Sequence, residues 1–423
     1  MLVFPALAAA LLTTSPQAAA VDTASPAIAA VAAVDLAESP RRFNHKRAGL
    51  EIGAAIAVGA VWYQSQIELN KLDFDFDRTW SDQWRRLSTS AGYRFDDNNP
   101  TLNVGHAFMG SIYHQFARAN GGTMAEALLF DFVTSSTWEL TVEHREVVSV
   151  NDQIVTTLGG VAVGESLFQL GDYFARSRPT VVNRALMSLF SPAHALGWLF
   201  GERPRPAADF EGAHGLAADA DHRFALSLGG AQAIADVGAA PAIERSDEAW
   251  RGALRLDLEL INLPEYGRAR NRSRWTRGGE FTHIEANLIG GRDRMRNQAL
   301  SARASLWGHH RHTAAAAGEG VRGSALYLGT ATAFDLTSDV LGPANDFVAA
   351  MHLVGPAVDA TLFRDRWRLR AGADLFPDFA MVRPYALREV PTGLPRAGMK
   401  STLQGSDYYY AFGMHSAARL EAA

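Results

Sequence analysis

The chain has 423 residues, of which 48% are hydrophobic and 20% charged, with a formal net charge of −5 at pH 7. This balance suits a folded protein of two or three domains. It lacks the basic excess of nucleic-acid-binding proteins, so no nucleic-acid partner is expected. Cysteine is absent, which suits export through an oxidising compartment but also occurs in cytosolic proteins.

The N-terminus has most features of an export signal. Leu2–Leu12 is a short apolar run, and Ala18–Ala20 supplies small residues for cleavage. No Lys or Arg precedes the apolar run, although a secretory signal normally has one. We expect a signal peptide over residues 1–20, with a disordered Ala-rich leader as the alternative. Residues 21–45 are rich in Ala, Pro and Ser and are expected to form a linker.

Residues 46–205 carry apolar residues at helical spacing and are expected to form a helical module. The first expected helix is too short to cross a bilayer of about 30 Å, which takes about 20 residues, so a buried or interfacial helix fits better. The expected helices are Leu50–Tyr63, Val104–Asn120, Thr123 to about Glu143, Ser149 to about Phe174, and short helices between Pro179 and Leu199.

Local signals mark the ends and contacts of these helices. Thr123 and Glu126 have the spacing of a capping box, and Gly121 can adopt the left-handed conformation that ends a helix. Gly160 and Gly164 make a small-xxx-small step, which allows another helix to approach closely. The sequence therefore predicts a small bundle of closely packed helices.

Single polar residues within these helices raise the question of function. His106, Gly110, His114 and Arg118 recur at a spacing of four and share one helix face. Acid–base chemistry would use His106, Glu139 or Glu143, which are the candidate catalytic residues. The alternative is a buried hydrogen-bond network that fixes the packing of the bundle. The expected members of that network are His106, Tyr113, Arg118, Glu139, Asn151, Asp152 and Glu165.

Metal and cofactor binding have no support in this half of the chain. The helices contain no Glu-x-x-His pair, which is the signature of di-metal bundles. We therefore predict neither a metal nor a cofactor. Within the otherwise apolar helices an unpaired charge would be very costly, so we expect Arg118, with its fixed charge, to pair with a carboxylate.

Four segments of the helical half carry a family resemblance: LDFDFDRTWSDQW, GYRFDDNNPTLNVGHAFMGSIYHQFARANG, SSTWELTVEH and SVNDQIVTTLGGVAVGE. Over roughly residues 50–200 the chain resembles a bacterial envelope family, domain of unknown function 3943. The resemblance implies a helical module ahead of an outer-membrane-like barrel, and it supplies no reaction. The matching positions are Asn99, Pro100, Gly105, His106, Gly110, Tyr113, Arg118, Trp138, Glu139, Asn151, Asp152, Gly159, Gly160 and Glu165.

Near residue 220 the period changes from helical to strict alternation. The clearest case is Trp250–Asn262, where leucines alternate with Arg255, Asp257 and Glu259 on opposite faces of a strand. Repeated stretches of about ten such residues are typical of a transmembrane β-barrel. We expect the charged residues to face the barrel interior and the leucines to face lipid, namely Leu254, Leu256, Leu258 and Leu260.

About nine strands are predicted in this half. The count is odd, although bacterial barrels have even numbers, so residues are missing beyond Ala423 or another strand lies near Met381–Val390. The polar segments Gly308–Arg322 and Arg383–Gly405 are expected to be extracellular loops. The predicted strands are His222–Ala235, Trp250–Asn262, Glu280–Gly290, Gln298–Gly308, Ser324–Leu336, Phe347–Val354, Val358–Phe363, Trp367–Phe376 and Tyr408–Leu420.

The predicted fold class is α+β, with the helical module over residues 46–205 and an antiparallel transmembrane β-barrel of roughly 8–12 strands over 206–423. A soluble antiparallel barrel with an apolar interior is the alternative. We expect an outer-membrane protein that handles lipid or a small solute, with outer-membrane lipid and the barrel-assembly machinery as partners. Its helical module would lie on the periplasmic side or plug the lumen. The alternative function is a membrane-embedded hydrolase acting on envelope lipid.

Overall fold

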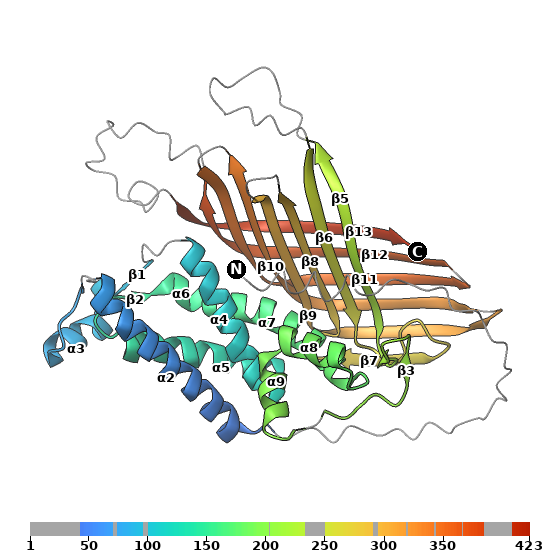
Figure 1. The fold of residues 1–423 in the computed structure, drawn as a ribbon, viewed down its shortest axis with the longest axis horizontal. Helices are drawn as coiled ribbons and strands as arrows, with labels where there is room; N and C mark the ends of the chain where they lie inside the picture. The colour runs from blue at the N-terminus through green and yellow to red at the C-terminus, as the bar shows by residue number, and fades with distance from the viewer. Residues whose placement is uncertain are drawn as a thin grey trace, which may run out of the picture.

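The computed structural model describes residues 43–70, 74–95, 100–202, 204–232, 250–290, 295–318, 320–341, 344–365, 367–384 and 408–423. The predicted signal peptide, nearly all of the predicted linker and most of the loop predicted over 383–405 lie outside them. Within the described residues, helices are followed by a large antiparallel sheet (Figure 1). The predicted α+β class is therefore confirmed.

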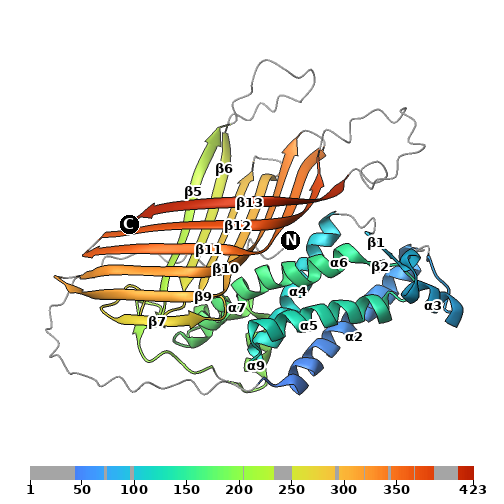
Figure 2. The same cartoon turned by 180° about the vertical axis from the view of Figure 1, so that it is seen from behind.

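The helical half is a bundle in which α4 and α7 make the most extensive contact. Figure 2 shows α4, α5 and α7 from the side opposite to that of Figure 1. Two π-helical turns extend the helices: Trp138–Val142 continues α5, and Val155–Gly159 joins α6 to α7. The helices are α2 His45–Asn70, α3 Trp80–Ser88, α4 Pro100–Ala119, α5 Met124–Thr137, α6 Val150–Ile154, α7 Gly160–Arg176, α8 Val181–Phe190 and α9 Pro192–Leu199.

Several of the predicted helix ends are confirmed, but α2 is longer at both ends than the predicted helix Leu50–Tyr63. Thr123 and Glu126 form the capping box, each side chain accepting the backbone N–H of the other residue. Gly121 has φ +89° just after α4, and Ser149 caps α6. The predicted short helices begin after Pro179, since Thr180 caps α8 and Pro179 lies before the helix.

The close helix contact predicted for Gly160 and Gly164 is confirmed, and the partner is α4. A Cβ atom on Gly160 would lie 2.7 Å from the carbonyl carbon of Gly110, and one on Gly164 would lie 3.0 Å from the Cα of Ser111. A Cβ on Gly110 would overlap the carbonyl oxygen of Thr156. The two helices thus touch backbone to backbone, which only glycine allows at these positions.

The large sheet has the order β5-β6-β8-β9-β10-β11-β12-β13, with β7 paired to β9. Two small pairs stand apart from it: β1 Tyr93–Arg94 with β2 Val148–Ser149, and β3 Phe210–Glu211 with β4 Leu216–Ala217. The strands of the large sheet are β5 Asp221–Gln232, β6 Trp250–Ile261, β7 Asn271–Thr276, β8 Phe281–Gly290, β9 Met295–Ala317, β10 Gly320–Leu341, β11 Ala344–Asp365, β12 Trp367–Arg383 and β13 Tyr409–Ala422.

Three predictions about the strands are wrong. The expected loop Gly308–Arg322 is mostly strand, at the hairpin ends of β9 and β10. The polar residues of this segment suggested a solvent-exposed loop, but His310 and His312 are buried in the sheet. The two strands predicted over 347–363 form one strand, β11, whose pairing shifts register between His352 and Ala357. The short strand β7 was not predicted.

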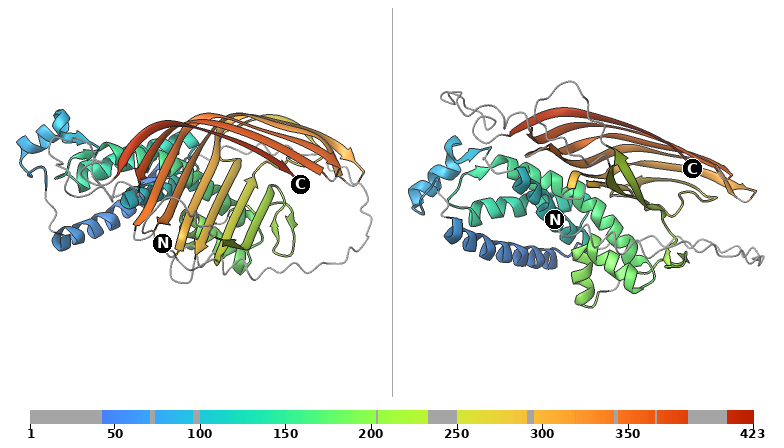
Figure 3. Two further views of the ribbon diagram at one scale, coloured as in Figure 1. Left: turned by 90° about the horizontal axis from the view of Figure 1, so that it is seen from above. Right: turned by 45° about the horizontal axis from the view of Figure 1, so that its top comes forward.

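The sheet is strongly curved (Figure 3), and its two faces differ in the side chains that they carry. Arg303 on β9 donates to Asp374, which lies three strands away on β12. Arg223 on β5 also reaches Glu421 on β13, at 3.2 Å. Contacts between strands so far apart in the sheet are possible only if the sheet curls and these side chains lie on its concave side. We call this side the charged face. The opposite side, which carries Leu254, Leu256 and Leu258, is the apolar face.

The curled sheet is not closed among the described residues. Charged side chains bridge the two ends of the sheet, since Arg223 of β5 pairs with Glu421 of β13, and Asp221 of β5 pairs with Arg368 of β12. No backbone ladder joins β5 to β13 in the part of the chain that the structure describes. The antiparallel sheet is therefore confirmed, whereas a closed barrel is not seen.

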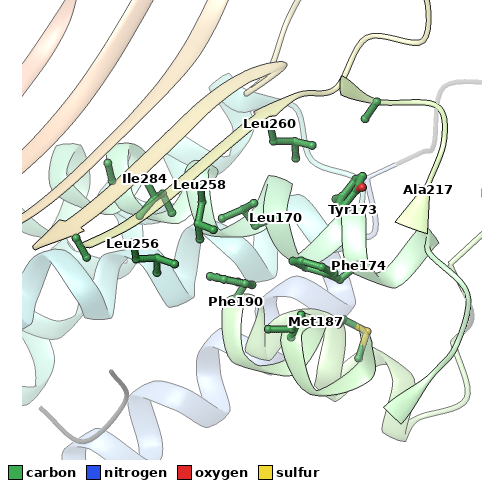
Figure 4. Close-up of a cluster of buried hydrophobic side chains, with 14 of the residues drawn as sticks. Leu170, Tyr173, Phe174, Met187, Phe190, Ala217, Leu256, Leu258, Leu260 and Ile284 are labelled. Carbon is green, nitrogen blue, oxygen red and sulfur yellow. The ribbon is translucent and has the colours of Figure 1, made fainter. Parts of the chain in front are cut away.

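The helical module packs on the apolar face of the sheet. Leu256, Leu258 and Leu260 are buried against Leu170 and Phe174 of α7 and other side chains of α8 (Figure 4). A second contact places Phe334, Met351 and Phe379 of the sheet against α4 and α7. The prediction that these leucines face lipid is wrong, because alternation shows which residues share a face and not what covers it. The module also lies opposite the charged face, so the structure does not place it as a plug among those side chains.

Candidate functional site

The first polar cluster of the helical module is centred on His114 of α4. Its Nδ1 lies 3.0 Å from Oδ2 of Asp131 on α5, and its Nε2 lies 3.0 Å from Oε2 of Glu165 on α7. Arg118, one turn further along α4, donates to both oxygens of Glu165, at 2.8 and 3.1 Å. The predicted pairing of Arg118 with a carboxylate is therefore confirmed. We call these four residues the His114 cluster.

Burial and pairing shift the ionisation of the His114 cluster. Desolvation alone would lower the pKa of His114, but Asp131 and Glu165 attract its proton and raise the pKa to about 9. Desolvation would raise the pKa of Glu165, but Arg118 and His114 hold it well below its usual range. Desolvation raises the pKa of Asp131 to about 7, against the opposing charge of His114. An imidazolium between two acidic groups best describes the arrangement.

The His114 cluster is sealed and also joins the module to the sheet. The side chains of His114, Asp131 and Glu165 are all 0% exposed. Glu165 Oε1 accepts the backbone N–H of Gly279, in the turn before β8, at 2.8 Å. Gln169 donates to the same oxygen and accepts from Asn262, which follows β6. Among the described residues these side chains are closed off from solvent, so their arrangement supports a structural role.

The second polar cluster lies on the same face of α4, two turns toward its N-terminus. His106 Nδ1 is 3.2 Å from Oδ1 of Asp152 on α6. Asn151 donates to Asn103 at 2.9 Å and to the hydroxyl of Tyr410 on β13 at 3.0 Å, and Asn103 donates to the same hydroxyl. We call these five residues the His106 cluster. It is less enclosed than the first, since the His106 side chain is 23% exposed.

Glu139 lies within the π-helical turn after α5, and Glu143 follows that turn. Glu139 accepts the backbone N–H of Ser149 at 3.0 Å. The buried Arg86 guanidinium of α3 donates to the backbone carbonyls of Glu139, at 2.7 Å, and of Glu143, at 3.2 Å. It therefore satisfies carbonyls that the end of a helix leaves unpaired. Burial raises the pKa of Glu143 to about 7, which a hydrogen bond from Trp138 partly opposes.

The single network predicted from the sequence is thus divided. The structure brings Arg118 and Glu165 together in the His114 cluster, and His106, Asn151 and Asp152 in the His106 cluster. Tyr113 is buried, and desolvation with the charge of Asp131 raises its pKa to about 12.

Sequence reasoning missed Asp131, Asn103, Tyr410 and Arg86, and it also missed the role of His114 as the bridging group. The position of Asp131 in the sequence could have indicated that it is buried. It interrupts the apolar run LLFDFV four residues after the buried Ala127 and four before the buried Ser135, on one helix face.

A comparison with protein families identifies the helical segment. Residues 92–193 match the family described as Domain of unknown function (DUF3943). The resemblance predicted from the sequence is confirmed over this segment. No curated protein and no solved structure matches the chain.

The DUF3943 segment covers the helices that build both polar clusters. It begins just before β1 and ends in α9. His106, His114, Arg118, Asp131, Asn151, Asp152 and Glu165 all lie within it. The architecture of these clusters is thus a property of the DUF3943 segment, while Gly279 and Tyr410 of the sheet complete them from outside it.

Among the described residues one helical stretch, Val150–Arg176, is long and apolar enough to cross a membrane by length and composition. It runs from α6 through the π-helical turn to α7, within the DUF3943 segment. The most apolar window of this stretch is 83% buried inside the protein. Burial to this extent is expected for a helix at the centre of the module.

The charged face of the sheet is a second candidate region, outside the DUF3943 segment. The buried Arg303 pairs with Asp359 at 3.1 Å and with Asp374 at 2.6 Å. Arg370 and Arg419 also reach Asp359, at 3.0 and 3.5 Å. Where the first and last strands meet, a small pocket is lined by Asp221, Arg223, Glu259, Ile261, Tyr266, Arg368, Arg370, Glu421 and Ala423.

Proposed function

We propose that this protein is an outer-membrane β-barrel protein that handles a lipid headgroup or a small polar solute along the charged face of its sheet. One observation carries the proposal: the concave face of a curled antiparallel sheet carries charged side chains beside an apolar cluster around Tyr266, Phe281 and Tyr327, and its other face leaves apolar side chains exposed. A soluble barrel has the reverse arrangement, because its interior is the apolar core. A transmembrane barrel has a polar interior and an apolar outer surface.

The pairing of the strands supports this assignment. On the apolar face, Leu326 pairs with Ala360, which pairs with Ala371, which pairs with Leu420 across four strands. The next ladder is Leu328, Val358, Ala373 and Ala418. The helical module leaves part of the apolar face uncovered, and the exposed apolar side chains there include Leu326, Leu328, Leu362, Leu369, Leu375, Phe412, Met414 and Leu420. A continuous apolar surface of this kind indicates contact with lipid or another apolar partner.

The helical module would lie against the outer wall of the barrel, on the periplasmic side. The His114 and His106 clusters each bond to the sheet, through Gly279 and Tyr410 respectively. The module is therefore fixed to the barrel wall by polar contacts as well as apolar packing, a suitable arrangement for controlling access to one end. Outer-membrane lipid and the barrel-assembly machinery are the partners that this proposal requires.

The substitution Leu328→Arg tests the membrane assignment. The Leu328 side chain is 54% exposed, so arginine should be harmless if the apolar face meets water, where surface substitutions change stability by less than about 0.5 kcal/mol. If this face meets lipid, the substitution should cost about 2–4 kcal/mol near the bilayer midplane. We expect much less assembled protein in the outer-membrane fraction, measured by immunoblot after fractionation of expressing cells.

Val181→Arg is the matched control, because Val181 is an 84% exposed apolar residue at the start of α8 in the helical module. It should assemble like the wild type. Equal outer-membrane yields of Leu328→Arg and wild type would contradict the proposal, as would recovery of wild-type protein from the soluble fraction.

The alternative, a hydrolase acting on envelope lipid, is favoured by one specific observation. His106 and Asp152 form a partly exposed pair, and the pKa of the neighbouring Glu143 is raised to about 7, near the value that suits a general acid or base. A strain carrying His106→Ala would distinguish the functions. Wild-type protein level with an altered envelope-lipid profile by mass spectrometry would favour the hydrolase. An unchanged profile at wild-type level would exclude catalysis by His106.

A further inference from the structure

A cluster of metal-ligand side chains lies on the charged face, outside both helical clusters. Asp335 of β10, His352 of β11 and His415 of β13 each offer one ligand atom, and these atoms all lie within 4.8 Å of one another. The rings of His352 and His415 are 4.4 Å apart between centroids. The three residues come from strands that lie within the last four of the sheet, so their separation is held by the backbone ladders.

The central histidine is oriented by a fourth residue. His352 Nδ1 lies 2.7 Å from Oδ1 of Asp378 on β12, and its Nε2 lies 2.9 Å from Oδ2 of Asp335. The His352 side chain is only 3% exposed and its ring stacks on Phe376. Donation from Nδ1 to Asp378 would leave the Nε2 lone pair directed toward Asp335. This is the carboxylate–histidine arrangement that orients metal-bound imidazoles.

We propose that Asp335, His352 and His415 bind a divalent transition-metal ion such as zinc, with Asp378 as the residue that positions His352. Two imidazole nitrogens and one carboxylate oxygen suit zinc and its neighbours, whereas calcium and magnesium prefer oxygen ligands alone. Three protein ligands leave a coordination position for water or a solute. The Asp335 side chain is 40% exposed, so the ion and its fourth ligand have access from the open side.

The backbone around the cluster is irregular on β11. Between His352 and Ala357 this strand shifts register against both of its neighbours, β10 and β12. Such bulges re-aim side chains and are frequent beside functional sites. Here they lie next to the residues that converge on the proposed ion.

A second cluster on the same face provides a contrast. Asp257, His283 and Glu285 also bring their ligand atoms within 4.8 Å of one another. There, however, Arg255 bonds Glu285 at 2.8 Å and lies 3.6 Å from Asp257, so a guanidinium already neutralises both carboxylates. The described ion pairs of Asp335 and Asp378 are instead with His352. Charge thus favours a cation at the first cluster and opposes one at the second.

Zinc binding by the purified full-length chain tests the proposal. After chelator treatment, titration with zinc chloride by calorimetry, with metal content by mass spectrometry, should give one tight site per chain. His415→Ala should weaken binding at least tenfold, and Asp378→Asn should weaken it roughly 10–100-fold, as is usual for a residue that orients a ligand. His283→Ala, in the contrasting cluster, should bind zinc like the wild type.

Asp335→Asn keeps the shape of the side chain and removes the charge of one ligand. It is the variant to test for zinc binding if His415→Ala fails to fold. Zinc binding unchanged in Asp335→Asn or in folded His415→Ala would overturn the proposal. Equal losses in His283→Ala and His415→Ala would overturn it too, as would a wild-type chain that takes up no zinc. These measurements do not depend on membrane insertion, so their failure is distinguishable from failure of the proposed function.

Discussion

Glu165→Ala is expected to lower the free energy of unfolding by about 3–5 kcal/mol, the usual cost of removing one partner of a buried ion pair. Glu165 accepts hydrogen bonds from Arg118, Gln169 and the backbone of Gly279, and it faces His114. Alanine would leave the guanidinium of Arg118 and a buried histidine without this carboxylate. Because Gly279 precedes β8, the contact between module and sheet should weaken as well.

Urea denaturation followed by circular dichroism measures this effect. Glu202→Ala is the matched control, since the half-exposed Glu202 pairs with Arg47 at the surface of the same module, and surface pairs contribute only about 0–1 kcal/mol. A Glu165→Ala chain that unfolds at the wild-type urea concentration would show that the His114 cluster does not stabilise the fold.

Features encoded by neighbouring residues were predictable from the sequence. The capping box at Thr123 and Glu126 depends on a spacing of three, and the close helix contact depends on Gly160 and Gly164 one turn apart. Alternation around Leu256 and Asp257 correctly separated the two faces of β6. In each case the physical requirement is met within one element, so a single sequence reveals it.

Features that depend on distant elements were not predictable. Nothing near Leu258 in the sequence indicates that α7 and α8 cover it, so lipid was the natural expectation. His114 could be placed on a helix face, but its two acidic partners come from two other helices. The proposed metal ligands Asp335, His352 and His415 are spread over three strands, so no metal-binding spacing exists for sequence analysis to find.

Gly110→Val is expected to destabilise the helical module by more than about 3 kcal/mol, the upper end of the usual range for overpacking. Even a single Cβ at this position would overlap the carbonyl oxygen of Thr156 and lie 3.0 Å from the Cα of Gly160. These are backbone atoms of the opposing helix, which cannot turn aside as a flexible side chain would. Relief therefore requires α4 and α7 to separate.

Gly105→Val is the matched control on the same helix, because a Cβ there meets nothing within 4 Å. Glycine and valine differ by less than about 0.5 kcal/mol in helix propensity, so this variant should unfold like the wild type. Urea denaturation of both variants measures the difference. Equal stabilities of the two would show that the helices do not meet as closely as described.

The same substitution should also disrupt the His114 cluster, although Gly110 carries no side chain. Gly110 lies one turn before His114 on the face of α4 that touches α7, and a Cβ on Gly164 would be 2.8 Å from that of His114. The glycine contact thus sets the distance at which His114 meets Glu165. We expect Glu165→Ala and Gly110→Val to be less than additive when combined, because each removes the interaction that the other depends on. Fully additive losses would mean that the cluster and the glycine contact stabilise the module independently.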